Sequence, residues 1–419
     1  MRNGISYIGL LKWLLCAVLP VSAQTGYSFQ KALQTAKANN PVLKTQHFDV
    51  GIAEADIITA KLRPNPILNN QSLQLTRPGA FAPNTPWYDG KNHQIWWQVT
   101  KPFQLPSQRK YKIEVAEKNV SYSQKIYNET ERGLLQDVAE KWIDVWTAKK
   151  QLDILQAAKN NTDSLVSINR LRLKNQVITQ TDLSRTELLA SQYALQIKSA
   201  EQEYRNELLN LKFFLGTQDD VRIDTSDTFA FAFSSGMDSL LQEALANRSD
   251  IQSFKLSIDA ANSNIKLQKA LSYPVPELGA IYNPQNKIPY VGFYGTIQIP
   301  LFSRNQGEIK KSQLIKQQAE QGLVTTQQQI QAEIVTAFNS YQTQKTNLQN
   351  FDGLLNQSNS ILNTVKYAYL RGGTTIIDYL EAQRSWLETR QQYYETLQAY
   401  RQSYIQLLYA SGLINQLAQ

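Results

Sequence analysis

Apolar residues recur every three to four positions over most of this chain, which is the spacing of amphipathic helices. Leu134, Val138, Trp142 and Val145 follow it within one such segment. The opposite faces of these segments are rich in Gln, Asn, Lys and Glu. The pattern therefore predicts a mainly α-helical protein whose helices each bury one face.

The distribution of proline predicts that some of these helices are very long. No proline lies between Ser107 and Tyr273, and none follows Pro300. A proline costs about 3 kcal/mol inside a helix, so its absence permits helices of unusual length. We predict one helix over 105 to about 172 and a second over 303 to about 370. At a rise of about 1.5 Å per residue, each would be roughly 100 Å long.

Two pairs of shorter segments alternate apolar and polar residues instead, and this alternation predicts β-strands. The expected strands cover 67–76 and 94–101 in the first pair, and 277–283 and 290–301 in the second. Alternation over about ten residues suits a strand of a transmembrane barrel, with lipid on one side and the lumen on the other. A half-buried strand in a soluble sheet has the same pattern.

Each long helix is followed by a turn signal and then by a second, shorter helical segment. The turns fall in 171–183 and 369–381, so we predict helical hairpins over 105–215 and 303–412. In the second turn, Gly372 and Gly373 allow the positive φ angle with which many helices end. Thr374 or Thr375 can then cap the returning helix, with Asp378 in its first turn, where the helix dipole favours an acid.

The chain is an internal duplication. Residues 32–43 resemble residues 240–251 at an offset of 208 positions. The segment Pro64–Pro66 corresponds to Pro274–Pro276 at an offset of 210 positions. Two further pairs recur at an offset of 196, namely Asp182 with Asp378 and Gly216 with Gly412. Four landmarks in the same order indicate two copies of a helix–strand–strand–helix unit. We divide the chain into a first repeat over 24–216, an equatorial segment over 217–247 and a second repeat over 248–419.

The strand count has a consequence for assembly. Four strands cannot close a barrel, for which about eight are the minimum. Three copies would supply twelve strands, and a closed barrel of twelve has no exposed edges. The same arrangement would join the helical hairpins into a tube. The fold class that we predict is mainly α with a transmembrane β-barrel portion completed by a homotrimer, and the trimer would be a conduit.

Composition excludes several functions. The 419-residue chain has a formal charge of +8, but its basic residues are scattered rather than clustered, so no nucleic-acid partner is expected. The only histidines are His47 and His93, whose spacing does not suit a metal site. No nucleophile–base arrangement or phosphate-binding loop is present, so we predict no enzymatic activity, no metal site and no cofactor.

The first 23 residues predict a secretory signal peptide. Arg2 and Lys12 flank the start of an apolar stretch over 13–21, and Ala23 ends a run of small residues that suits cleavage. The single cysteine, Cys16, lies within this leader, so the mature protein should have no disulfide bond. No later segment has 18 uninterrupted apolar residues, and we therefore expect no membrane-spanning helix.

The order of these elements resembles that of the TolC-type outer-membrane efflux protein family. The resemblance covers about 28 to 415 and includes a tip motif of Tyr369, Gly372, Asp378 and the sequence Leu-Glu-Ala-Gln. The segment 299–308 is similar to the branch that serves metal efflux. This resemblance implies a trimeric channel-tunnel in the outer membrane of a Gram-negative bacterium, with a large periplasmic part whose mouth closes by inward-coiled helices.

The resemblance also implies roles for residues of the two tips. Asp378 matches an acid that forms a ring across the pore, Glu381 is a second acid one turn later, and Asp182 is the acid of the first repeat. Tyr369 matches the tip tyrosine of the same gate. The alternative from the residues alone is that these acids only stabilise helix N-termini. Thr374 replaces an arginine that helps to lock the mouth of the type member.

Further tip residues would contact partners. The resemblance implies a periplasmic adaptor and an inner-membrane pump of the resistance-nodulation-division type, with outer-membrane lipid around the barrel. The tip residues expected to dock the adaptor are Gly372, Gly373, Leu370, Leu173 and Asn175. Two alternatives remain at this point: a conduit for type I protein secretion, and a secreted coiled-coil protein that forms no channel. No motif specifies the cargo.

Overall fold

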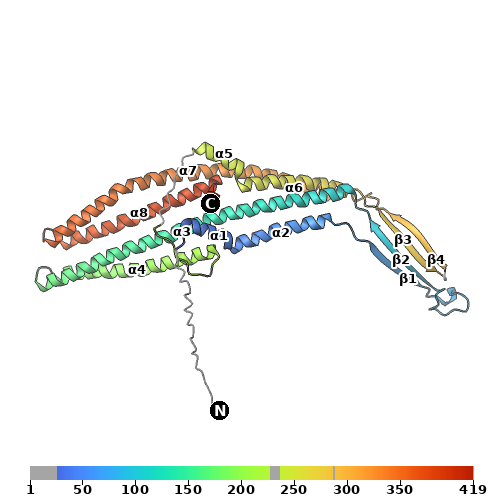
Figure 1. The fold of residues 1–419 in the computed structure, drawn as a ribbon, viewed down its shortest axis with the longest axis horizontal. Coiled ribbons are helices and arrows are strands. Elements are labelled where there is room, and N and C mark those ends of the chain that lie inside the picture. Colours follow the sequence, from blue (N-terminus) through green and yellow to red (C-terminus); the bar gives the residue numbers. More distant parts are fainter. Residues whose placement is uncertain (1–25, 227–235, 286–287, 419) are drawn as a thin grey trace, which may run out of the picture.

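The structure is a computed structural model, and it describes residues 26–226, 236–285 and 288–418. The predicted signal peptide over 1–23 lies outside the described residues. The molecule is a long rod, with two helical hairpin tips at one end and a small sheet at the other (Figure 1). The described part of the N-terminal region and the C-terminal residues lie near the middle of the rod.

Long helices account for most of the rod. α3 (Pro106–Lys174) has 69 residues and α7 (Gln306–Leu370) has 65, and each is followed by a 36-residue helix. Pro106 occupies the first turn of α3, where a proline removes no helical hydrogen bond. The remaining helices are α1 (Phe29–Asn39), α2 (Pro41–Lys61), α4 (Gln180–Leu215), α5 (Met237–Asn247), α6 (Ser249–Leu271), α8 (Ile376–Ser411), and the short 3₁₀ helices η1 (Pro78–Ala80) and η2 (Ile414–Ala418).

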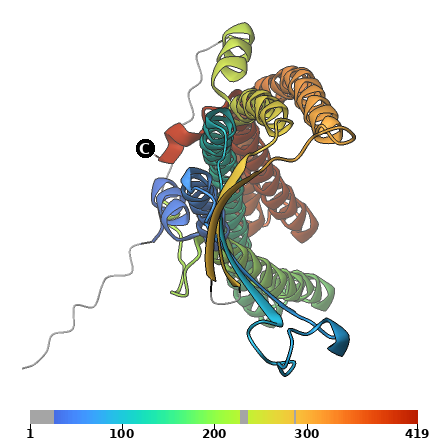
Figure 2. The same cartoon turned by 90° about the vertical axis from the view of Figure 1, so that its right-hand side faces the viewer.

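The two repeats pack side by side through α3. This helix contacts α4, its own hairpin partner, and also α6 and α8 of the second repeat. At the waist of the rod α1, α5 and η2 pack around the long helices (Figure 2). Trp142 of α3 is completely buried there, and its ring meets Phe29 of α1 edge to face at 5.5 Å. The largest hydrophobic core therefore lies at the waist, and a second one lies between the hairpins.

The sheet has four antiparallel strands in the order β1-β2-β3-β4, so the pairing of β2 with β3 joins the repeats. The strands are β1 (Ile67–Gln74), β2 (His93–Pro102), β3 (Glu277–Gln285) and β4 (Ile288–Thr296). The prediction that the last strand extends to Leu301 is wrong. Thr296 pairs with Glu277, which is the first residue of β3, so the residues after Thr296 have no partner strand. The first strand likewise ends at Gln74 rather than at 76.

One face of the sheet is apolar and exposed. The register places Leu68 opposite Val99, Val99 opposite Ala280 and Ala280 opposite Phe293, so these residues share a face. The large exposed side chains on this face, which we call the apolar face, are Leu68, Trp97, Val99, Leu278, Tyr282, Val291 and Phe293. No helix covers them in Figure 1. None of the described helices combines the length and the hydropathy that crossing a membrane requires.

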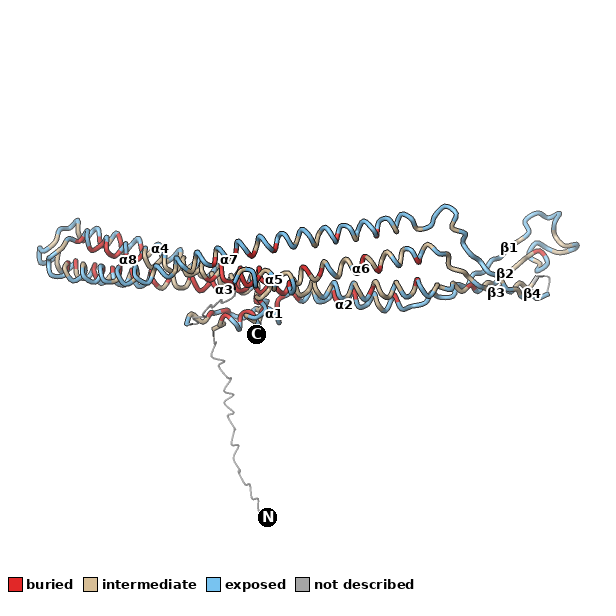
Figure 3. The backbone as a smooth tube through the Cα atoms, turned by 90° about the horizontal axis from the view of Figure 1, so that it is seen from above, coloured by how far each residue is buried: buried red, intermediate tan, exposed pale blue. Residues whose placement is uncertain are grey.

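Burial is uneven along the rod. Buried residues gather at the waist and in the hairpins, whereas the sheet and the neighbouring part of α7 are largely exposed (Figure 3). Between Gln306 and Gln329, for example, only Ser312 and Ala319 of α7 are buried. The chain therefore leaves a large amount of apolar surface exposed at the sheet end of the rod.

Candidate functional site: the two hairpin tips

Both tips end their first helix with the same hydrogen-bonding pattern. In the first tip the N–H of Val177 donates to the carbonyl of Arg172 (2.9 Å), and Gln176 has a φ of 58°. In the second tip the N–H of Gly373 donates to the carbonyl of Ala368 (2.8 Å), and Gly372 has a φ of 79°. This is the Schellman motif, in which a left-handed residue reverses the chain. Gly372 was expected to take this conformation, whereas Gln176 takes it without being a glycine.

Both tips also begin their second helix with the same reciprocal cap. The hydroxyl of Thr375 accepts the N–H of Asp378 (3.2 Å), while Asp378 Oδ2 accepts the N–H of Thr375 (3.1 Å). Thr179 and Asp182 make the equivalent pair. Each pair satisfies two backbone donors that a helix N-terminus leaves free. The capping role considered from sequence is therefore present at both acids.

Asp378 has one additional partner. The hydroxyl of Thr374 donates to Asp378 Oδ2 (2.6 Å), and with the two bonds from Thr375 it holds the pKa of Asp378 below its usual range. These bonds all reach Oδ2, and no described residue bonds to Oδ1. Asp378 and Glu381 are exposed, and Asp182 is half-buried. Capping thus uses one carboxylate oxygen of Asp378 and leaves the other without a partner among the described residues.

Tyr369 lies inside the protein rather than on the surface of the tip. Its side chain is 3% exposed, and its hydroxyl donates to Asn169 Oδ1 (2.7 Å) on α3. Asn169 in turn donates to the hydroxyl of Thr186 (2.9 Å) on α4. Arg172 donates to the carbonyl of Tyr369 (3.1 Å) and lies over its ring at 4.7 Å. These residues link both helices of the first hairpin to the second hairpin.

A second polar contact couples the hairpins farther from the tip. Gln383 of α8 is buried, and its side-chain nitrogen donates to the carbonyl of Ala158 (3.0 Å) and to the hydroxyl of Thr162. Sequence reasoning missed this contact and the one at Asn169. Thr162 and Asn169 lie seven residues apart on the buried face of α3, and polar residues at that spacing among apolar ones were the available signal.

The predicted docking residues are mostly accessible. Gly372, Gly373 and Asn175 are exposed, Leu370 is 46% exposed and Leu173 is half-buried. Sequence reasoning missed three further exposed apolar residues on the tips, which are Leu171, Val177 and Ile377. Each tip therefore presents apolar side chains beside a polar turn.

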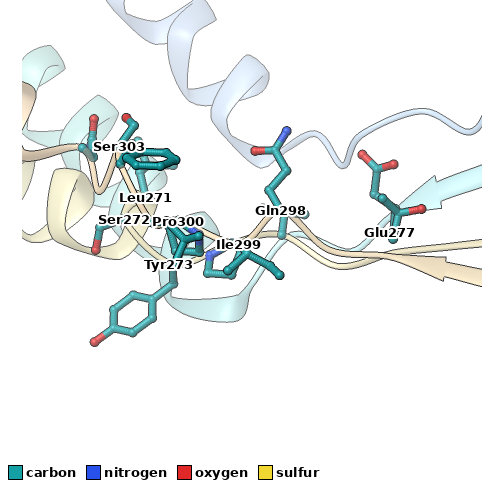
Figure 4. A pocket seen from close by; sticks show the side chains of 14 residues that line it. Leu271, Ser272, Tyr273, Glu277, Gln298, Ile299, Pro300 and Ser303 are labelled. Atoms are coloured by element: carbon teal, nitrogen blue, oxygen red, sulfur yellow. The ribbon is translucent and has the colours of Figure 1, made fainter.

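A pocket of about 790 Å³ lies where the second repeat enters and leaves the sheet (Figure 4). It is lined by side chains such as Tyr273, Ile299 and Pro300, with Glu277 as its one acid. Among residues 26–226, 236–285 and 288–418, no group of His, Cys, Asp and Glu could hold a metal ion.

Comparison with known proteins agrees with this geometry. Over 276 residues the chain is 24% identical to the pyoverdine export outer membrane protein OpmQ of Pseudomonas putida; the match covers 62% of this chain and 57% of OpmQ. The open-state MtrE channel of Neisseria gonorrhoeae has the same fold, with a TM-score of 0.75, 16% identity and coverage of 93% of this chain and 90% of MtrE. The CmeC channel of Campylobacter jejuni has a TM-score of 0.73 and 16% identity, and the match covers 92% of this chain and 85% of CmeC.

A family model spans both repeats. The model described as "Outer membrane efflux protein" matches residues 32–217 and 240–413, and the gap between them falls in the equatorial segment. Family members are channels or transport proteins rather than enzymes. Two hairpins on an open four-stranded sheet and a match over both repeats lead to one conclusion: the chain belongs to the outer membrane efflux protein family.

Proposed function

We propose that this protein is the outer-membrane channel of a tripartite efflux system and works as a homotrimer. The observation that carries the proposal is the sheet, which has an exposed apolar face and leaves one edge of β1 and one edge of β4 unpaired. Pairing β4 of one copy with β1 of the next would give twelve strands in a closed barrel, with the apolar face toward lipid. The three copies would also join their helices into a periplasmic tube.

The tips would close this tube. Three copies of Asp182, Asp378 and Glu381 near one axis would form acidic rings, which favour cations and hold divalent ions. In Asp378 the capping bonds occupy one carboxylate oxygen and leave the other available, so capping and pore lining are compatible. Tyr369 would act differently, because its buried hydroxyl ties the second hairpin to Asn169 of the first.

The exposed turns of the tips would receive the other components. A periplasmic adaptor would contact Leu370, Leu173, Asn175 and the glycines Gly372 and Gly373, and an inner-membrane pump of the resistance-nodulation-division type would supply the cargo. Adaptor contacts that favour a dilated tip would shift the population toward an open channel. The export of pyoverdine by the relative OpmQ favours a small-molecule cargo over a secreted protein.

Planar-bilayer conductance of the purified full-length protein tests the proposal. We expect small cation-selective currents that divalent cations block when added on the periplasmic side. Asp378→Asn should relieve this block while keeping the reciprocal cap, because the side-chain oxygen of an asparagine can still accept the N–H of Thr375. The control is Asp238→Asn, which removes an exposed acid from α5 at the waist and should leave the block unchanged.

The outcomes separate the parts of the proposal. A protein that stays monomeric in detergent and gives no current would overturn the trimeric channel. Large currents that divalent cations do not block would keep the channel but remove the acids from its axis. The class of cargo would then be identified by comparing a deletion strain with the same strain carrying the restored gene. The comparison would measure their sensitivity to drugs, metals and siderophores.

A further inference from the structure

The two hairpins of the sheet end very differently. Residues 75–92 connect β1 to β2, whereas only residues 286 and 287 connect β3 to β4. The longer connection, which we call the outer loop, is organised around Asn92, a side chain that is 2% exposed. Its Oδ1 accepts the N–H of Ala82 (2.8 Å), and its Nδ2 donates to the hydroxyl of Thr85 (2.9 Å) and to the carbonyl of Pro86 (2.8 Å). A loop ordered in this way loses little entropy on binding.

The outer loop returns toward the apolar face of the sheet. The register places Gln74 on the same face as Leu68. The side-chain nitrogen of Gln74 donates to the carbonyl of Trp87 and to that of Asn92 (3.0 Å). The backbone at Trp87 therefore lies at the end of the apolar face rather than above the opposite, more polar face.

Two aromatic side chains stand exposed at this position. Trp87 is 60% exposed and Tyr88 is 74% exposed, and their rings meet edge to face at 6.5 Å. At the same end of the sheet the apolar face becomes polar, because Ser72, Gln74 and His93 are its last positions there. Ser72 and His93 hydrogen-bond one another (2.5 Å). Aromatic residues with a polar tip concentrate at such boundaries between hydrocarbon and water.

The base of the outer loop carries two cations that have no partner. Arg77 and Lys91 lie at the two ends of the loop, just beyond the last backbone contact, in which the N–H of Leu75 donates to the carbonyl of Asn92 (3.0 Å). Both are exposed, and neither forms an ion pair within the described residues. The only acid of the loop is Asp89, and its Oδ1 accepts the N–H of Lys91 (2.8 Å). The site therefore has unpaired positive charge beside an aromatic and apolar surface.

From this juxtaposition we propose that the end of the β1–β2 hairpin binds a lipid whose headgroup carries phosphate. The apolar face would contact the acyl chains, Trp87 and Tyr88 would lie at the level of the headgroup, and Arg77 and Lys91 would bind the phosphates. Arginine binds phosphate with two parallel hydrogen bonds, and lysine adds a point charge. The proposal rests on the proposed membrane location and adds a specific lipid and its site. The second hairpin has no comparable loop, so each subunit would hold one such site.

The test is native mass spectrometry of the purified full-length protein, with diphosphorylated lipid A and its dephosphorylated form as probes. The wild-type protein should retain the phosphorylated form preferentially. Reversing both charges with Arg77→Glu and Lys91→Glu should lower that affinity about tenfold or more, since the phosphates would then face two acids in place of two basic residues. The matched control reverses two exposed lysines of the helices, Lys198→Glu and Lys255→Glu, and should have no effect.

Further measurements locate the binding energy and separate possible failures. Trp87→Ala with Tyr88→Ala should weaken the binding of both lipids, and inorganic phosphate should not displace either. Equal retention of both lipids by the wild-type protein, or unchanged affinity after the charge reversal, would overturn the lipid site. A channel that conducts but does not discriminate between the lipids would disprove this inference alone. A protein that neither trimerises nor conducts would instead disprove the proposed function.

Discussion

The two hairpin tips have the same backbone but different surroundings. Gln176 and Gly372 take the same left-handed conformation at an offset of 196, and Thr179 and Thr375 cap the next helix in the same way. Their side chains differ beyond that. Tyr369 of the second tip is buried against the first hairpin, whereas its counterpart Leu173 is half-buried.

The shape of each tip and its attachment to the other hairpin therefore depend on different contacts. The turn requires only contacts between residues a few positions apart, which each tip makes for itself. The attachment requires a donor on one hairpin and an acceptor on the other, and only the second tip supplies the tyrosine. We therefore expect removal of the cap to have similar effects in both tips, and changes in the attachment to have unequal effects.

The largest difference is expected at the attachment. Tyr369→Ala removes a buried aromatic ring and leaves Asn169 without its donor, so it should destabilise the contact between hairpins by about 3 kcal/mol. Leu173→Ala, at the matching position, should cost less because that side chain is half-buried. Hydrogen exchange of the amides around both tips measures the local opening free energy. Equal protection in the two variants would contradict the unequal attachment.

Exchanging the left-handed residues should produce effects of opposite sign. Gly372→Ala places a β-carbon at a φ of 79° and should cost about 1–2 kcal/mol, although no described residue beyond its two chain neighbours lies within 4 Å of that carbon. Gln176→Gly relieves the same strain and should stabilise the first tip. The gain is reduced because a glycine raises the entropy of the unfolded chain. Hydrogen exchange of the tip amides measures both effects. Destabilisation by Gln176→Gly would show that the Gln176 side chain makes an essential contact.

Removing the cap should affect the two tips alike. Thr179→Ala and Thr375→Ala each delete one acceptor and should cost about 1 kcal/mol. Faster exchange of the first amides of α4 and α8 would register the loss. A cost confined to one tip would contradict the equivalence of the two caps.

The smallest effect is expected from pH. The pKa of Asp378 is lowered in the folded chain, so its contribution to tip stability is complete above about pH 4, the unfolded value, and is lost as the pH falls through the folded pKa. Thr374→Val removes the largest cause of the shift and should move this loss to higher pH. Exchange of the Thr375 amide at a series of acidic pH values follows it. An unchanged profile would show that the Thr374 bond is not formed in solution.

Sequence patterns were sufficient for features that depend on near neighbours. The periodicity predicted α3 and α7, and the turn residues and the acid Asp378 predicted where the chain reverses. The repeat offsets and tip motif were also sufficient for the resemblance to the family, which the family model confirms. They were less successful at the end of β4, where the apolar–polar alternation continues past Thr296. Thr296 pairs with Glu277, the first residue of the antiparallel strand β3, so later residues have no partner.

Local sequence was thus enough to predict the helices and their caps, because the hydrogen bonds that form them join residues within a few positions of one another. Which polar residues meet across the hairpins became clear only from the packing of the folded chain. Tyr369 and Asn169 are separated by 200 positions. The return of the outer loop to the end of the apolar face also depended on the strand register. Contacts of this kind depend on how whole helices and strands pack, and no local pattern along the chain records that packing.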